Sequence, residues 1–189
     1  MPITGKGWEL LVTRLGIHKS GAKQRTYATY QVFIDGKAVQ ELSGHICECI
    51  GPGSTNSNAK PARRIPAGRY PLATQFGTNY KTIGFSTITK PPGKKPLPGI
   101  RLLNTAPRKD VLIHAGHPPK LYLSSIGCLN PTAPLKAKDD MDFIDSRTRA
   151  IALIESLNNF AHAAFAKKAN TPIPNAFAVI DGEPMDPVP

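Results

Sequence analysis

The strongest constraint on the fold is a β-hairpin signal in the first quarter of the chain. Residues 27–34 are rich in aromatic and β-branched side chains, which favour extended strands. They run directly into Asp35-Gly36, a dipeptide typical of the tight turn between antiparallel strands, and residues 38–42 continue beyond it. The sequence therefore predicts a hairpin here, and with it a sheet that the rest of the chain must extend or cover.

Other short segments share this β character and are separated by turn-forming residues. The chain has 19 prolines and 16 glycines, spread along much of its length. Such a distribution favours short strands joined by turns over a bundle of helices. The expected strands and extended segments are residues 8–15, 45–50, 65–72, 100–103, 111–114 and 176–180.

One long helix is expected between about residues 140 and 168. Apolar residues recur there in steps of three and four, which places them on one helical face. Asp145 or Ser146 is suited to cap the main body of this helix, and Lys167 and Lys168 suit the negative end of its dipole. Prolines 172 and 174 prevent further continuation.

These elements predict a mainly β (α+β) fold with one long C-terminal helix packed on the strands. At 189 residues a single domain is expected, over residues 1–170. Residues 171–189 are expected to add a short strand and a loose, proline-rich acidic tail.

The net charge limits the kinds of molecule that the chain is expected to bind. The chain carries 24 Lys+Arg against 13 Asp+Glu, a net charge of +11. This charge favours binding to nucleic acid, to an anionic membrane or to an acidic polymer such as peptidoglycan, or it simply keeps the chain soluble. Basic residues alternate with prolines, as in residues 90–96, and form no helical stripe with aromatics, so a specific nucleic-acid reader is not indicated. No apolar run approaches the roughly 20 residues that span a bilayer, so membrane insertion is not expected.

The first nine residues lack the apolar stretch of a signal peptide. The sequence therefore predicts synthesis in the cytoplasm without a Sec-type signal. Action on a cell wall would then require non-classical export to the periplasm.

The segment most suggestive of catalysis contains both a histidine and a cysteine. His114 ends an apolar strand, and Cys128 closes a Ser-x-Gly-Cys motif that begins at Ser125. A thiol at its free pKa is largely protonated, so a nucleophilic cysteine needs a base such as an imidazole. Gly127 leaves room beside the sulfur, and backbone N–H groups at such a turn can stabilise an oxyanion.

This arrangement resembles the L,D-transpeptidase catalytic domains and related L,D-transpeptidase-like domains. Those domains carry a histidine-glycine element, a variable spacer and then Ser-x-Gly-Cys followed by an aliphatic residue. Here the matching residues are His114, Gly116 and residues 125–129, and residues 64–70 are similar to the turn before the catalytic half. The likeness covers about residues 27–157 and is strong around His114 and Cys128.

The resemblance implies a β-sandwich and a cysteine enzyme that acts on peptidoglycan stem peptides. Cys128 would attack the carbonyl at the L-centre of diaminopimelate and release D-alanine, with His114 as the general base. Gly127 and Cys128 would supply oxyanion N–H groups, and Ser125 would brace the turn. The acyl-enzyme would pass to an amine or to water, with no metal or organic cofactor.

Three positions depart from the family pattern and shift the expected substrate contacts. Ile126 stands where the family often has histidine, Asn130 where arginine is common, and Ala115 splits the His-Gly pair. An arginine that grips the substrate carboxylate must therefore come from elsewhere, with Arg101 or Arg147 as candidates. The remaining expected substrate-binding residues are Gly116, His117 and Asn130.

Other interpretations of these residues stay open. Cys128 and His114 are also compatible with core packing, and His117 is a rival base. His45, Cys47 and Cys49 alternate along a strand and could join His114, His117 or Cys128 in a zinc site, although their spacing matches no familiar zinc motif.

Three functions compete at this stage. The first is the peptidoglycan enzyme, used as an antibacterial effector toxin or carried by a phage, with an immunity protein or a secretion-system component as further partner. The second is a non-catalytic module of the same fold that binds cell wall or another polyanion. The third is an interaction protein of a phage or secretion particle.

Overall fold

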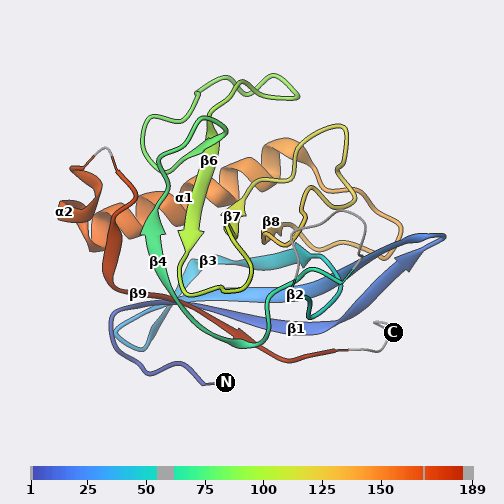
Figure 1. Ribbon diagram of the computed structural model, residues 1–189, viewed down its shortest axis with the longest axis horizontal. Coiled ribbons are helices and arrows are strands. Elements are labelled where there is room, and N and C mark those ends of the chain that lie inside the picture. Colours follow the sequence, from blue (N-terminus) through green and yellow to red (C-terminus); the bar gives the residue numbers. More distant parts are fainter. Residues whose placement is uncertain (1, 55–61, 168, 185–189) are drawn as a thin grey trace.

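The computed structural model describes residues 2–54, 62–167 and 169–184, and these contain nine strands and two helices (Figure 1). In chain order the elements are β1 (Trp8–Ser20), β2 (Lys23–Ile34), β3 (Lys37–Glu48), β4 (Gly68–Thr74), β5 (Tyr80–Lys81), β6 (Leu97–Leu102), β7 (Leu112–His114), β8 (Asn130–Thr132), α1 (Phe143–Phe160), α2 (His162–Phe165) and β9 (Pro172–Asp181).

The predicted hairpin is confirmed. β2 and β3 pair antiparallel, and Ile34 opposite Lys37 leaves Asp35 and Gly36 as the two turn residues. Both have positive φ, 46° and 76°, which a two-residue turn matching the twist of the strands requires. The segments predicted at residues 38–42 and 45–50 form one continuous strand, β3, up to Glu48.

The described strands join in one sheet with the order β5-β6-β4-β9-β1-β2-β3-β8, and β7 pairs with β6. β1 and β9 run parallel, whereas β1–β2, β2–β3, β4–β9 and β4–β6 are antiparallel. One end of this path, β8, lies close to β7, because Leu129, just before β8, exchanges backbone hydrogen bonds with Leu112 and His114 of β7. The sheet therefore curves around the core and brings the segments that carry His114 and Cys128 together.

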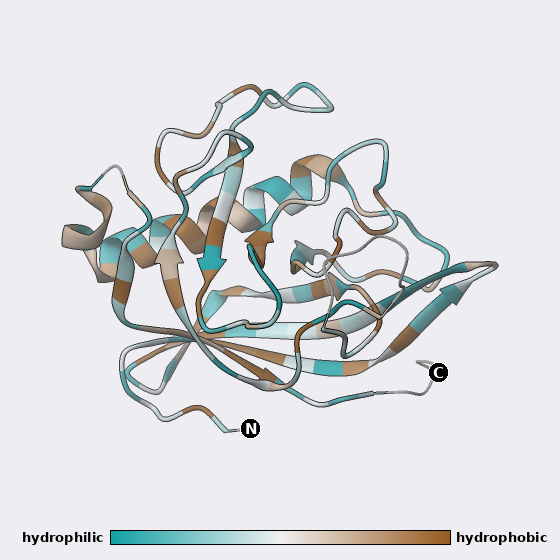
Figure 2. Cartoon of the chain, viewed as in Figure 1, coloured by the Kyte–Doolittle hydropathy of each residue, from teal (hydrophilic) through white to brown (hydrophobic). Residues whose placement is uncertain are grey.

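The core fills the inside of this curved sheet and is covered by α1. Hydrophobic stretches follow the strands and one side of α1 in Figure 2. Fully buried residues from both layers pack in one cluster, among them Trp8, Leu10, Ile113, Leu129, Leu153 and Leu157. A mainly β fold with one long helix is thus confirmed.

The helix is shorter than predicted and is capped by a different residue. α1 ends at Phe160, and Ala161, with φ −138°, separates it from α2. The cap is Asp142, whose carboxylate accepts from the N–H of Asp145, so the predicted caps Asp145 and Ser146 are wrong. Asp142 is favoured because it precedes the first apolar position, Phe143, which is buried. Lys168 lies outside the described residues.

The C-terminal segment is more firmly held than the sequence predicts. β9 lies between β4 and β1, so it is central to the sheet. The Glu183 carboxylate pairs with Arg64 at 2.7 Å and with Arg14 at 3.3 Å, so a loose tail is wrong at this position. Residues 185–189 of that predicted tail lie outside the described residues.

No helix in the described part of the chain is long and apolar enough to cross a membrane.

Candidate active site

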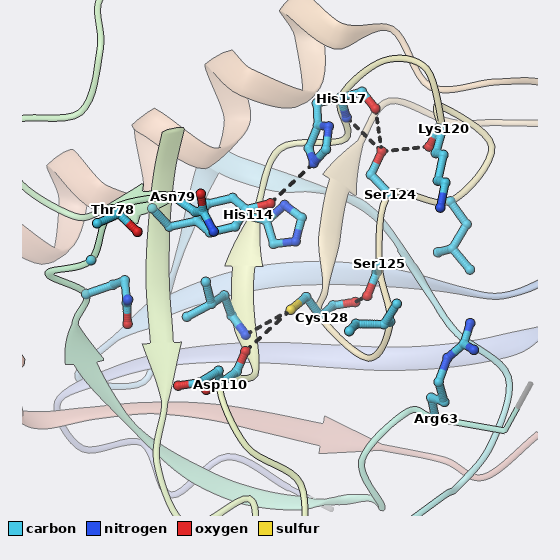
Figure 3. A pocket seen from close by; sticks show the side chains of 16 residues that line it. Arg63, Thr78, Asn79, Asp110, His114, His117, Lys120, Ser124, Ser125 and Cys128 are labelled. Carbon is cyan, nitrogen blue, oxygen red and sulfur yellow. Dashed lines mark hydrogen bonds between the residues drawn. The ribbon is translucent and has the colours of Figure 1, made fainter. Parts of the chain in front are cut away.

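A cavity of about 930 Å³ opens beside β7 and the turn that carries Cys128 (Figure 3). His114 and Cys128 both line its wall, together with Ser125 and His117 from the predicted site. The residues used below are Arg63, Tyr80, His114, His117, Lys120 and Cys128.

Strand register places Cys128 and His114 on the same face. Ile113 and Leu129 are parallel bridge partners, and both side chains are buried in the core. Since side chains alternate along extended segments, His114 and Cys128 point to the opposite side, which is the cavity. Their Cβ positions are diagonal neighbours across this bridge, although no hydrogen bond joins the thiol to the imidazole in the part of the chain described.

His114 is held as a neutral base. Its ring is 2% exposed, and burial lowers the pKa of His114 to about 4. Nδ1 lies 2.8 Å from the carbonyl oxygen of Ala115, which can only accept, so the proton of the neutral ring is assigned to Nδ1. The lone pair of Nε2 is therefore available to accept a proton.

Asn130 supports His114 from behind rather than contacting the cavity. Its amide Nδ2 donates to the carbonyl oxygen of His114 at 3.0 Å, and the side chain is fully buried. Asn130 is not among the described residues that line the cavity, so its predicted role in substrate binding stays a prediction. Its position fixes the backbone of the histidine.

The turn before Cys128 is closed by Ser125. The Ser125 hydroxyl donates to the carbonyl of Cys128 at 2.7 Å and accepts from the N–H of Gly127 at 2.8 Å. The Gly127 N–H is thus already engaged, so its predicted role as an oxyanion donor is not available in this conformation. No hydrogen bond to the Cys128 N–H is found among the described residues, so within them that group is available to donate one.

Glycine at 127 is required by both conformation and packing. Its φ is +140°, and a Cβ there would lie 2.2 Å from Nη2 of Arg108. That nitrogen donates to the carbonyl of Ile126 at 2.6 Å, so the guanidinium lies directly beneath the turn. Arg108 is buried and brings a positive charge close to Cys128, which favours the thiolate.

Burial nevertheless dominates the acidity of the nucleophile. The half-buried Cys128 accepts a hydrogen bond from the N–H of Leu112 at 3.3 Å. Burial raises the pKa of Cys128 to about 11, and the Leu112 N–H and Arg108 only partly oppose it. At neutral pH the Cys128 thiol and the His114 imidazole are therefore both uncharged.

The rate of alkylation of Cys128 by iodoacetamide should rise roughly tenfold per pH unit from pH 7 to 10, because only the thiolate reacts. Peptide mapping by mass spectrometry measures this rate separately from Cys47 and Cys49. A plateau that begins below pH 7 would contradict the neutral pair and indicate a preformed thiolate–imidazolium pair. Protein unfolded in urea serves as the control, with a rate that levels off near the ordinary thiol pKa.

His117 and Tyr80 extend the site beyond the nucleophile. The Tyr80 ring packs on His114 with centroids 4.6 Å apart, and its hydroxyl lies 3.3 Å from Nε2 of His117. Ser124 holds the backbone of His117, accepting from its N–H at 2.7 Å. His117 thus lines the cavity and is hydrogen-bonded to Tyr80 rather than to Cys128.

The remaining predicted substrate residues lie outside the cavity. Arg101, on β6, pairs with Asp110 at 2.8 Å and donates to the Gln75 side chain at 3.2 Å, and both of these partners line the cavity. The N–H of Gly116 donates to the Ser146 hydroxyl at 2.7 Å, which ties the histidine loop to α1. Arg147 is buried and hydrogen-bonds to the carbonyl of Ser86. None of the three lines the cavity itself, and their predicted roles in substrate binding stay predictions.

The zinc alternative gains no support from the described residues. They contain no group of three or more His, Cys, Asp or Glu side chains arranged to hold a metal ion. His45 stacks on Tyr27 with ring centroids 5.0 Å apart, and Cys47 is buried in a small apolar cluster. Cys49 donates from its thiol to the carbonyl of Ser125 at 3.2 Å.

Sequence reasoning missed Tyr80, Arg108 and Arg63. Each is an isolated residue in a loop or a very short strand, and no motif marks it. Comparison with protein-family models, curated proteins and solved structures gives no match for this chain.

Proposed function

We propose that this chain is a cysteine acyltransferase of the L,D-transpeptidase type that acts on peptidoglycan stem peptides. The observation that carries the proposal is the placement of Cys128 and His114 on one face, in a cavity, with Nε2 of the histidine free to accept a proton. A curved form of the L,D-transpeptidase-like β-sandwich belongs to the same proposal.

In the proposed reaction His114 takes the thiol proton as the Cys128 sulfur attacks the carbonyl at the L-centre of diaminopimelate. The Cys128 N–H stabilises the oxyanion of the tetrahedral intermediate. As the intermediate collapses, the C–N bond breaks and the imidazolium returns the proton to the leaving D-alanine amine. A second amine or water then resolves the thioester.

The second candidate is a non-catalytic module on the same fold that binds cell wall. Two observations favour it: the raised pKa of Cys128, and the engagement of the Gly127 N–H by Ser125. Neither blocks catalysis by itself, because substrate that displaces water can bring the thiol and imidazole together.

Delivery to the periplasm or cell wall by a secretion system, as an antibacterial effector with an immunity protein, completes the proposal. The supporting observations are the peptide-sized cavity and the net charge of +11, which suits an anionic wall. Expression of the chain with an added export signal should then be toxic, and expression in the cytoplasm should not.

The direct test is product analysis. Purified protein is incubated with tetrapeptide-bearing muropeptides, with and without excess D-amino acid, and both products and intact protein are weighed by mass spectrometry. The expected result is loss or exchange of D-alanine together with an acyl adduct that maps to Cys128. Absence of both, with an active control enzyme present, would favour the binding module.

A further inference from the structure

Two further cavities lie next to the cavity at Cys128. Two smaller cavities, of about 170 and 330 Å³, adjoin it around Leu123. The first shares Arg63 and Leu123 with the main cavity, and the second shares Lys120 and Leu123. Gln24, at the start of β2, lines both of the smaller ones. The three cavities thus lie side by side around Leu123 and share wall residues, and together they form a groove region that extends from Cys128 to the turn between β1 and β2.

Three cationic side chains follow this extension: Arg63, Lys120 and Lys23. Lys23 and Lys120 are exposed at the rim, where a ligand from solution can reach them. Among the described residues that line the two smaller cavities, the one carboxylate is that of Asp140. In the main cavity Asp110 is already paired with Arg101 at 2.8 Å. The extension therefore has an excess of positive charge.

The walls of the extension are fixed before any ligand arrives. Fully buried Arg25, on β2, donates to the carbonyl of Tyr122 at 2.9 Å and packs its guanidinium 4.3 Å from the centre of that ring. This contact clamps the segment that carries Lys120 and Leu123 onto the β1–β2 hairpin. A preorganised groove avoids the entropy cost of ordering its walls on binding.

We propose that this extension is a binding site for an acidic peptide, in which Lys23, Lys120 and Arg63 hold carboxylates of the substrate distant from the scissile bond. The assignment rests on the proposed function, because the peptide enters the groove with its reacting carbonyl at Cys128. It also supplies carboxylate recognition from residues that line the cavities, which Arg101 and Arg147 do not. Charge selects the peptide, and the shape around Leu123 fixes its path.

Single-stranded nucleic acid fits the groove less well. Such ligands need exposed aromatic faces on which bases stack. Among the described residues that line the two smaller cavities, Tyr122 supplies the one aromatic ring; it is 7% exposed, and Arg25 and Lys23 lie over it at 4.3 and 5.4 Å. The described residues of this extension therefore offer charges at its rim and no free stacking surface.

The test compares two charge-reversed proteins in a Cys128→Ala background, which binds without turnover. One carries Lys23→Glu and Lys120→Glu; the matched control carries Lys37→Glu and Lys90→Glu, two exposed lysines outside the three cavities. The probe is a fluorescent stem tetrapeptide with free carboxylates, measured by anisotropy at low salt beside its amidated form. Thermal melts check that both proteins fold.

The groove variant should bind the acidic probe about tenfold more weakly than the control does, with little difference for the amidated probe. Equal affinity of the two variants, or tighter and equally charge-dependent binding of a single-stranded oligonucleotide, would overturn the assignment. Acyl-adduct formation on otherwise wild-type protein separates the two proposals. If the Lys23→Glu, Lys120→Glu protein forms the acyl adduct normally, only the assignment of the acidic-peptide site is wrong. If binding depends on charge but no adduct forms on any protein, the proposed enzymatic activity is wrong and the peptide-binding site remains.

Discussion

Alanine in place of Cys128 is expected to lower the proposed release of D-alanine from tetrapeptide muropeptides by at least about a thousandfold, because in the proposed reaction the covalent intermediate forms on the Cys128 sulfur. The half-buried Cys128 lines the cavity and lies on the His114 face. Single-turnover assays with saturating substrate measure the loss, and the acyl adduct should disappear with it.

Cys49→Ala is the matched control. Its thiol donates to the carbonyl of Ser125, on the same turn that carries Cys128, but it is buried and does not line the main cavity. Removing one such hydrogen bond costs about 1 kcal/mol of folding free energy, so this variant should remain folded and lose no more than a few-fold in rate.

One outcome would contradict the assignment of the nucleophile, and a second would show that the turn itself is sensitive to substitution. Retained turnover in Cys128→Ala would mean that the activity does not depend on this thiol. Equal loss in Cys49→Ala and Cys128→Ala, with both proteins folded, would mean that the turn tolerates no change and that chemistry cannot be read from either variant. Urea unfolding of both proteins separates lost folding from lost chemistry.

The part of the site that could be predicted is the part that a motif encodes. Cys128 was recognised by its Ser-x-Gly context, and His114 by its place at the end of an apolar strand. His114 and Cys128 share one face because Ile113 and Leu129 form a parallel bridge. This bridge is isolated: it joins residues 16 positions apart in the sequence and is not part of a regular strand pair. No local pattern specifies such a bridge.

The fold, too, has parts that local sequence patterns predict and parts that they do not. The hairpin was predictable because turn chemistry and β propensity agree there. β5 and β8, of two and three residues, are too short for any periodic signal, and Pro131 in β8 argues against a strand. They form because neighbouring strands offer unpaired edges, which is a property of the assembled sheet.

Buried charges were also beyond sequence reasoning. Arg14 and Glu48 form a buried pair at 2.9 Å, and Arg64 is buried against Glu183. In a chain with net charge +11 these arginines look like ordinary surface residues. Burial raises the cost of leaving any of them without a partner, so they hold particular loops to particular strands.

Arg25→Met should therefore destabilise the protein by about 3 kcal/mol, because methionine keeps an apolar stem but leaves several buried acceptors without a donor. The Arg25 guanidinium donates to the carbonyls of Tyr122, Asp139 and Lys136 at 2.9 to 3.0 Å. It also lies 3.2 Å from Nδ1 of His18, a ring whose pKa burial and Arg25 lower to about 4.

Urea unfolding at pH 7 measures the change, with Lys19→Met as the control. Lys19 is exposed on the neighbouring strand β1, so its loss removes one positive charge and no described hydrogen bond, and should alter the unfolding free energy by at most about 0.5 kcal/mol. Equal stability of the two variants would mean that the segment from Tyr122 to Asp139 is held by its other contacts. A selective loss in Arg25→Met, together with faster alkylation of Cys128 under native conditions, would show that one buried guanidinium fixes both the fold of this segment and the closure of the site.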